Sequence, residues 1–157
     1  MNAITSISTP IGNLTVEANT EGVRRIFFSE ELIEQTGPAD TSAKAIASNA
    51  ANQLTDYFSG KRHTFNLPLD LSELPPYHRT VLKEVINVPF GKTASYGDVA
   101  NQTGNPNAAR AVGNANANNP ISIVIPCHRV IAGNGGLGGY GGRLDRKEFL
   151  LRHENAL

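Results

Sequence analysis

The chain has 157 residues, and its 39% hydrophobic and 18% charged content is typical of a folded globular protein. Its 14 Lys and Arg balance 14 Asp and Glu, which argues against a basic protein that coats nucleic acid. The N-terminus lacks a signal-peptide pattern and no apolar run is long enough to span a membrane, so we expect a soluble, cytoplasmic protein. A single cysteine excludes an internal disulfide and a multi-cysteine zinc site, so no metal is expected.

The N-terminal residues predict a small β-meander packed on one helix. Three strand-like runs are separated by turn residues: 3–8, 14–18 and 23–28. Apolar residues recur at helical spacing over residues 43–58, and Gly60 follows where a helix would end. We therefore expect a β-rich N-terminal domain over residues 1–70 and a proline-rich linker over residues 71–76.

Residues 77–157 predict a second, mostly helical domain, which makes the fold class α+β. An apolar stripe over residues 81–86 indicates one helix, and Ser95 is placed to cap the next. That second helix should stop at Gly104, and Asn107 is expected to cap a third helix over residues 108–117. Two short helices joined by a four-residue turn form a helix-turn-helix pattern.

The remaining C-terminal residues contain three further features. Residues 121–125 read as a buried extended run, and the glycine-rich residues 133–142 predict an irregular loop. A final helix is expected from Asp145 to about Glu154, with Phe149 and Leu150 facing inward. The loop also fits G-x-G-x-x-G, but it lacks the surrounding βαβ unit, so a dinucleotide site is rejected.

Charge is distributed unevenly between the two predicted domains. Residues 1–76 contain 5 Lys and Arg against 9 Asp and Glu, a net charge of −4, and residues 77–157 have the reverse excess. In the third C-terminal helix, Arg110 and Asn114 share a face with small residues, which would let a backbone approach DNA closely. Arg110 could equally be a solvated charge on an alanine-rich helix.

Cys127 is a candidate nucleophile with a competing structural interpretation. A lone cysteine is usually a buried small hydrophobe. Here Pro126 stiffens the chain before it, and His128 and Arg129 supply basic groups that favour the reactive thiolate. The same pattern allows an ordinary buried histidine and an arginine held in an ion pair, and Tyr140 could either face a ligand or anchor its glycine loop.

Several motifs in order resemble the O6-alkylguanine-DNA alkyltransferases, also called methylated-DNA-protein-cysteine methyltransferases. They cover residues 77–155 with high specificity: 90–96, 104–113, 119–120, 126–130, 139–142 and 147–154. The resemblance implies DNA repair by direct damage reversal, in which one alkyl group passes irreversibly from O6-alkylguanine to Cys127. Such a suicide methyltransferase acts once and needs no cofactor.

The resemblance also implies roles for individual residues in the transfer. Cys127 matches the alkyl acceptor, and its own carbonyl matches one that accepts from the guanine amine. His128 matches the histidine that takes the thiol proton through a water, with Glu154 polarising it. Asn119 matches the asparagine that braces the active-site turn.

Further positions match residues that bind DNA and the damaged base. Tyr96 matches the tyrosine that helps to turn the damaged nucleotide out of the duplex. Arg110 matches the arginine that takes the place of that nucleotide. The nucleotide must leave the duplex because a stacked base is inaccessible to the thiol. Tyr140 and the Val130 carbonyl match groups that hold guanine, and the Gly141 N–H matches one near the leaving oxygen. The implied partner is double-stranded DNA bound through the minor groove by a monomer, with cooperative binding and O4-alkylthymine repair left open.

Three other functions are compatible with parts of this pattern. An alkyltransferase-like protein would bind the lesion without transfer, but such proteins usually lack the acceptor cysteine. A helix-turn-helix regulator would read DNA sequence rather than damage. A thiol hydrolase would use Cys127 and His128 on an amide or ester.

Overall fold

The computed structural model describes residues 1–35, 37–134, 136–141 and 143–157. The chain divides into two compact units, Met1–Glu73 with Pro120–Ser122, and Leu74–Asn119 with Ile123–Leu157. Among the described residues, no helix has the length and apolar character needed to cross a membrane. The α+β class predicted from the sequence is confirmed, and the extents of the two domains and their linker stay a prediction.

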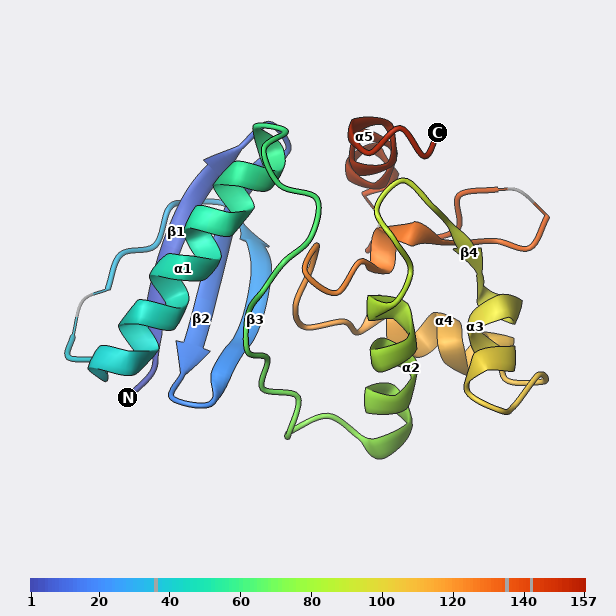
Figure 1. Cartoon of the computed structure of the whole chain (residues 1–157), viewed down its shortest axis with the longest axis horizontal. Coiled ribbons are helices and arrows are strands. Elements are labelled where there is room, and N and C mark those ends of the chain that lie inside the picture. The colour runs from blue at the N-terminus through green and yellow to red at the C-terminus, as the bar shows by residue number, and fades with distance from the viewer. Residues whose placement is uncertain (36, 135, 142) are drawn as a thin grey trace. The chain divides into compact units, whose positions relative to one another are not determined.

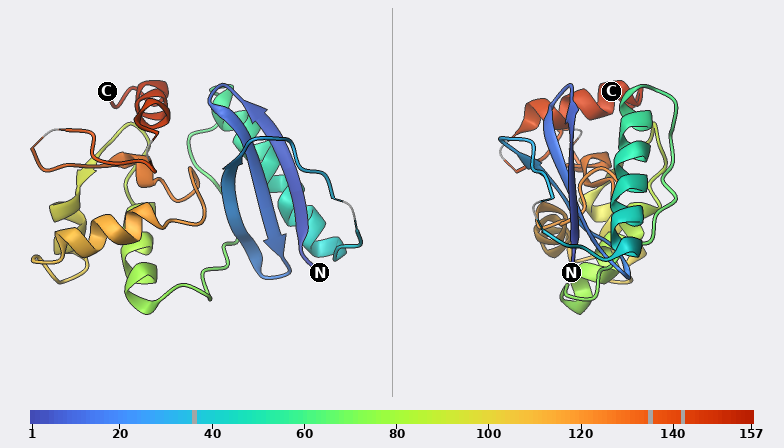
Figure 2. Two further views of the ribbon diagram at one scale, coloured as in Figure 1. Left: turned by 180° about the vertical axis from the view of Figure 1, so that it is seen from behind. Right: turned by 90° about the vertical axis from the view of Figure 1, so that its left-hand side faces the viewer.

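The first unit is an antiparallel meander with one helix on its face. β1 (Ala3–Thr9), β2 (Gly12–Asn19) and β3 (Gly22–Ser29) are hydrogen-bonded in chain order. α1 (Thr41–Phe58) lies along one face of this sheet (Figure 1 and the right-hand view of Figure 2). The strands and the helix lie where the sequence predicts them.

The core of the first unit forms because the apolar face of the sheet and the apolar face of α1 pack against each other. Alternate residues of β2, Leu14, Val16 and Ala18, are fully buried, as period-two side chains on one sheet face should be. Ala50 and Leu54 of α1 are also fully buried, which places small and large apolar groups on the covered face. Burial of this apolar surface is the main stabilising contribution.

The outer edge of β3 is covered by two short segments from later in the chain. The Val23 N–H donates to the Pro68 carbonyl at 2.8 Å, and the Asp70 N–H donates to the Val23 carbonyl at 2.8 Å. Further along the strand, the Ile26 N–H donates to the Pro120 carbonyl at 2.9 Å, and the Ser122 N–H returns a bond to Ile26 at 3.1 Å. These bonds satisfy an edge that would otherwise expose unpaired backbone groups.

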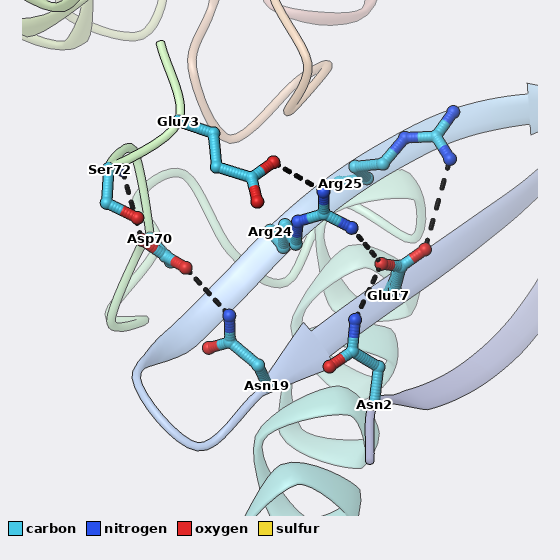
Figure 3. Close-up of polar contacts among 8 residues, drawn as sticks. All are labelled: Asn2, Glu17, Asn19, Arg24, Arg25, Asp70, Ser72 and Glu73. Carbon is cyan, nitrogen blue, oxygen red and sulfur yellow. Dashed lines mark hydrogen bonds and ion pairs between the residues drawn. The ribbon is translucent and has the colours of Figure 1, made fainter.

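A polar network reinforces the first of these contacts (Figure 3). Arg24 of β3 donates to Glu17 of β2 at 2.7 Å and also pairs with Glu73, while Asn19 donates to Asp70 at 2.7 Å. Gly22 allows the close approach, because a Cβ at this position would lie 2.6 Å from the Pro68 carbonyl oxygen. The proline-rich segment is therefore held on the sheet as far as Glu73.

The second unit is a group of short helices around a two-stranded parallel ladder. α2 (Pro76–Ile86), α3 (Tyr96–Gln102) and α4 (Ala109–Ala117) contact one another. β4 (Ala94–Ser95) pairs with β5 (Val130–Ile131), directly after the 3-10 turn η1 (Cys127–Arg129). The last element, α5 (Leu144–His153), contacts η1. The β4–β5 pair was not predicted, since two-residue strands carry no periodic pattern.

The capping chemistry predicted for the two helices of the helix-turn-helix is correct for one of them. Ser95 accepts a hydrogen bond from the Asp98 N–H, and the Asp98 side chain accepts one from the Ser95 N–H, which completes a capping box. The prediction of Asn107 as the cap of α4 is wrong. Ala108 holds the cap position without a side-chain bond, because its N–H closes a turn onto Asn105 that places Asn107 inside the turn.

Two other local predictions need correction. The run 121–125 is buried except at Ser122, but it is not continuously extended, because Ile123 adopts a left-handed conformation with φ of 73°. Leu150 faces the core as predicted, whereas Phe149 is only half-buried and stacks on His153 one turn later. The predicted glycine loop is irregular over its described residues, and Gly135 and Gly142 lie outside them.

Candidate active site

Cys127 begins the η1 turn and is nearly enclosed, with 6% of its surface exposed. Two asparagines from the C-terminal part of α4 and the residues after it hold this turn. The Asn116 side chain donates to the Cys127 carbonyl at 3.1 Å, and the Asn119 side chain donates to the Ile125 carbonyl at 2.9 Å. The backbone on both sides of the thiol is thereby fixed by buried or half-buried amide groups.

His128 and Glu154 are brought together from η1 and the end of α5. The His128 Nε2 lies 2.7 Å from a Glu154 carboxylate oxygen, and both side chains are fully buried. Arg129 donates to the same carboxylate from Nε at 2.8 Å and from Nη2 at 3.0 Å, and its Nη1 donates to the Val88 carbonyl. A carboxylate that accepts three hydrogen bonds orients both the imidazole and the guanidinium.

Burial shifts the pKa values of the thiol and the imidazole in opposite directions. Burial raises the pKa of Cys127, while a hydrogen bond from Asn119 and the charge of Lys147 oppose that rise. Burial lowers the pKa of His128, with the Glu154 carboxylate opposing that change. The resting site at neutral pH therefore contains a neutral thiol and a neutral imidazole that can accept its proton.

Besides the Asn116 Oδ1, two buried polar atoms in this region have no hydrogen-bond partner among the described residues. One is the His128 Nδ1, and the other is the Tyr140 hydroxyl, which lies in the glycine loop. Burial raises the pKa of Tyr140 well above its ordinary value, and the Cys127 charge adds to that rise. Buried polar atoms are normally hydrogen-bonded, so unpaired ones in one site indicate groups available to a substrate or to a proton transfer.

The glycine loop approaches both the ladder and the N-terminus of α3. Lys147 of α5 is fully buried and donates to the Val130 carbonyl at 2.6 Å and to the Gly139 carbonyl at 3.2 Å. Gly138, with φ of 75°, lies so close to Tyr96 that a Cβ there would be 2.6 Å from the Tyr96 hydroxyl. Gly141 is exposed and also left-handed, with φ of 56°. The loop is thus tied to Val130 and lies against Tyr96.

α4 presents an exposed polar face that includes Arg110. The residues predicted to share this face are all exposed: Asn107, Arg110, Ala111, Asn114 and Asn118. Val112 and Ala115 point into the core on the opposite side. Arg110 has no ion pair or hydrogen bond to any residue within the described ranges. Its guanidinium is therefore free to contact an external group.

Two residues at the site were not singled out from the sequence. Asn116 and Lys147 are both buried and hydrogen-bonded to backbone carbonyls of the active-site segment. A signal for Lys147 existed, because it lies on the same helical stripe as Leu150, Leu151 and Glu154. A charged residue on a core-facing stripe is unusual enough to mark a function.

Comparison with known proteins connects this geometry to a family. Residues 76–156 match the DNA-binding domain model of 6-O-methylguanine DNA methyltransferase, and residues 3–71 match the ribonuclease-like domain model of the same enzyme. The chain is 40% identical over 151 residues to the methylated-DNA–protein-cysteine methyltransferase of Mycobacterium tuberculosis, covering 96% of this chain and 91% of the relative. It is 38% identical over 162 residues to the constitutive Bacillus subtilis methyltransferase of the same name, covering 98% and 96%.

A solved structure has a similar fold over the whole chain. The crystal structure of Mycobacterium tuberculosis OGT in complex with DNA superposes with a TM-score of 0.84 at 40% identity, covering 98% of this chain and 93% of that one. Family models match both parts of the sequence, and the curated relatives align over nearly their full lengths. This chain therefore belongs to the O6-methylguanine-DNA methyltransferase family.

Proposed function

We propose that this protein repairs O6-alkylguanine in double-stranded DNA by transferring the alkyl group to Cys127. The observation that carries the proposal is the only cysteine of the chain, held in a braced turn directly before a buried histidine–carboxylate pair. The relatives are named for the same reaction, and one similar structure contains DNA. Because the substrate would be genomic DNA, we place the reaction in the cytoplasmic compartment that contains it.

The chemical step is a displacement at carbon. The Cys127 sulfur forms a bond to the alkyl carbon, while the bond from that carbon to the guanine O6 breaks and its electron pair stays on the base. The thiol proton leaves before or during attack, and one proton returns to the guanine, so that ordinary guanine is restored. The thioether product has no route back to a thiol, which makes each molecule act once.

His128 is the base that this geometry supports. Its Nε2 faces the Glu154 carboxylate at 2.7 Å, so Nε2 carries the proton and Nδ1 has the free lone pair. The Nδ1 has no partner among the described residues, which suits proton transfer from Cys127 through a water. The lowered pKa of His128 keeps it neutral at neutral pH, as a base must be. Glu154 acts through His128 and is a positioning residue.

The groups that contact DNA and the damaged base in this proposal belong to α3, α4, β5 and the glycine loop. Arg110 is exposed and unpaired among the described residues at the start of α4, which suits a side chain that enters the minor groove and replaces a flipped nucleotide. Tyr96 at the start of α3 would help to turn the nucleotide out. Tyr140, the Val130 carbonyl and the Gly141 N–H would then hold the extruded guanine.

The two carbonyls assigned to guanine recognition already accept hydrogen bonds from this chain. The Asn116 side chain and the Val130 N–H both donate to the Cys127 carbonyl, and Lys147 donates to the Val130 carbonyl. A carbonyl oxygen accepts two hydrogen bonds, so the guanine amine would share the Cys127 carbonyl with these donors or displace one of them. The existing bonds would aim both carbonyls before the base arrives, which is the arrangement expected of a preorganised site.

The decisive experiment measures the mass of the Cys127 peptide before and after incubation with a duplex that contains one O6-methylguanine. We expect a single added methyl group per protein molecule, and none in Cys127→Ser. Tight binding to the lesion without an added methyl group would overturn the proposal in favour of a lesion-binding protein. A parallel duplex with O4-methylthymine tests the second substrate, and titration of protein on DNA tests binding as a monomer.

A further inference from the structure

We propose that Lys147 is a positioning residue for the alkyl transfer, whose buried ammonium joins the glycine loop to the active-site segment and places a positive charge at the end of the turn that begins with Cys127. The inference rests on the proposed function and extends the part that Lys147 plays there, where its bond aims the Val130 carbonyl. It starts from the burial of Lys147, whose side chain is fully enclosed within the second unit.

Burial of an ammonium is costly unless its donors are satisfied. Lys147 donates to the Val130 carbonyl at 2.6 Å and to the Gly139 carbonyl at 3.2 Å, and these two acceptors belong to different segments. Val130 is the residue after the η1 turn that begins with Cys127, and Gly139 lies in the glycine loop directly before Tyr140. One side chain therefore sets the position of that loop segment relative to the turn that carries the thiol.

The same ammonium acts on the thiol through its charge. Its interaction with Cys127 lowers the pKa of the thiol against the larger effect of burial. The thiolate in turn raises the pKa of Lys147, although burial dominates and lowers it to about 8. Among the described residues, Tyr140 interacts with Cys127, and His128 interacts with Lys147, Glu154 and Arg129; the Lys147 charge lowers the His128 pKa.

These effects act together during transfer. When His128 accepts the thiol proton, negative charge develops on sulfur inside a buried site where water solvates it poorly. A fixed positive charge nearby stabilises that developing thiolate, and its repulsion of a charged imidazole helps to keep His128 neutral before the reaction. Lys147 would thus favour the thiolate and fix the loop at Gly139 relative to Val130.

The first test titrates Cys127 by the ultraviolet absorbance of its thiolate, with Cys127→Ser subtracted as the blank. Because the chain has one cysteine, the signal reports this thiol alone. In Lys147→Met we expect the thiolate fraction at a given pH below the midpoint to fall about tenfold, the effect of losing a nearby opposite charge. Lys147→Arg should retain most of it, and Lys83→Met, which removes an exposed charge from α2 of the same unit, should not change it.

The second test rests on the pH profile of the unaltered protein, and Lys147→Arg serves as the comparison. Thiol ionisation alone would make the transfer rate rise steadily with pH. Loss of the Lys147 charge above about pH 8 should instead make the transfer rate of the wild-type protein level off and fall. The arginine in Lys147→Arg stays charged, so the transfer rate of this variant, relative to its own rate at neutral pH, should continue to rise.

The outcomes separate this inference from the proposed function. The thiolate titration contains no DNA, so its result stands whether or not alkyl transfer is observed. An unchanged titration in folded Lys147→Met, or a wild-type rate that rises without a break above pH 8, would overturn the role of Lys147. A missing methyl adduct on the wild-type protein would overturn the proposed function while leaving the titration as a valid test.

Discussion

Replacement of Glu154 by Gln tests the proton path with minimal change in shape. The carboxylate accepts hydrogen bonds from His128 and from two nitrogens of Arg129 at 2.7, 2.8 and 3.0 Å. Glutamine offers one oxygen and an NH2 group, so at least one of these donors would face another donor. If the NH2 faces His128, the imidazole must accept at Nε2 and carry its proton on Nδ1, which can then no longer take a proton from Cys127.

The hydrogen bonds of Glu154 predict the effect of Glu154→Gln on both the alkyl transfer rate and the free energy of unfolding. General base catalysis contributes about 10² to 10⁴ in rate, and we expect Glu154→Gln to slow alkyl transfer by about 10²-fold. Removing one partner of a buried ion pair costs about 3–5 kcal/mol, but the retained amide bond and the Arg129 bond to Val88 should limit the loss to about 2–3 kcal/mol. The carboxylate also raises the pKa of His128, so its loss weakens the base further.

The assay is a single-turnover measurement of methyl transfer from an O6-methylguanine duplex, with protein in excess and the reaction quenched at short times. Urea unfolding of the same preparation separates a loss of stability from a loss of rate. Glu148→Gln is the matched control, because Glu148 lies on the same helix in an exposed pair with Arg152. A folded Glu154→Gln protein that transfers at the wild-type rate would refute the proton path through His128.

Three further predictions test the DNA contacts, the loop and the titration of the site. Arg110→Ala should slow repair in duplex DNA by about tenfold through weaker stabilisation of the flipped state, but should leave the reaction with free O6-benzylguanine unchanged; equal losses would contradict an intercalating role. Gly138→Ala should lower the free energy of unfolding by about 1–2 kcal/mol, because its φ of 75° disfavours a side chain and Tyr96 must move; Gly139→Ala, which has open space, should be neutral in the same urea titration. Burial holds the pKa of His128 in the folded protein below 6.5, so the unfolded state binds more protons. The free energy of unfolding should therefore fall as pH decreases below 6.5. A fall of the same size in His128→Asn would contradict the assignment of this pH dependence to His128.

The local structure of this chain could be read from its sequence because the determining interactions are short-range. Period-two and helical spacings place the three strands and α1, and the capping box of Ser95 and Asp98 marks the start of α3. The wrong assignment of Asn107 as the cap of α4 also has a local cause. Asparagine is favoured both in turns and at helix caps, and here Asn107 lies in the turn while Ala108 holds the cap position. Adjacent residues such as Cys127 and His128 are likewise visible together in sequence.

The assembled site depended on contacts between residues far apart in the chain. Resemblance to a family linked Glu154 to His128, but only the fold shows that Arg129 shares the same carboxylate. Sequence patterns do not reveal that Lys147 is buried against two carbonyls, because helical spacing gives the face of a residue and not its neighbour. The left-handed turn at Ile123 is also a tertiary result, as a β-branched residue disfavours that conformation locally. The sequence determined which chemical groups are present and in what order. Tertiary packing decided how deeply they are buried, and burial sets the pKa values that make the Cys127 thiol and the His128 imidazole a reactive pair.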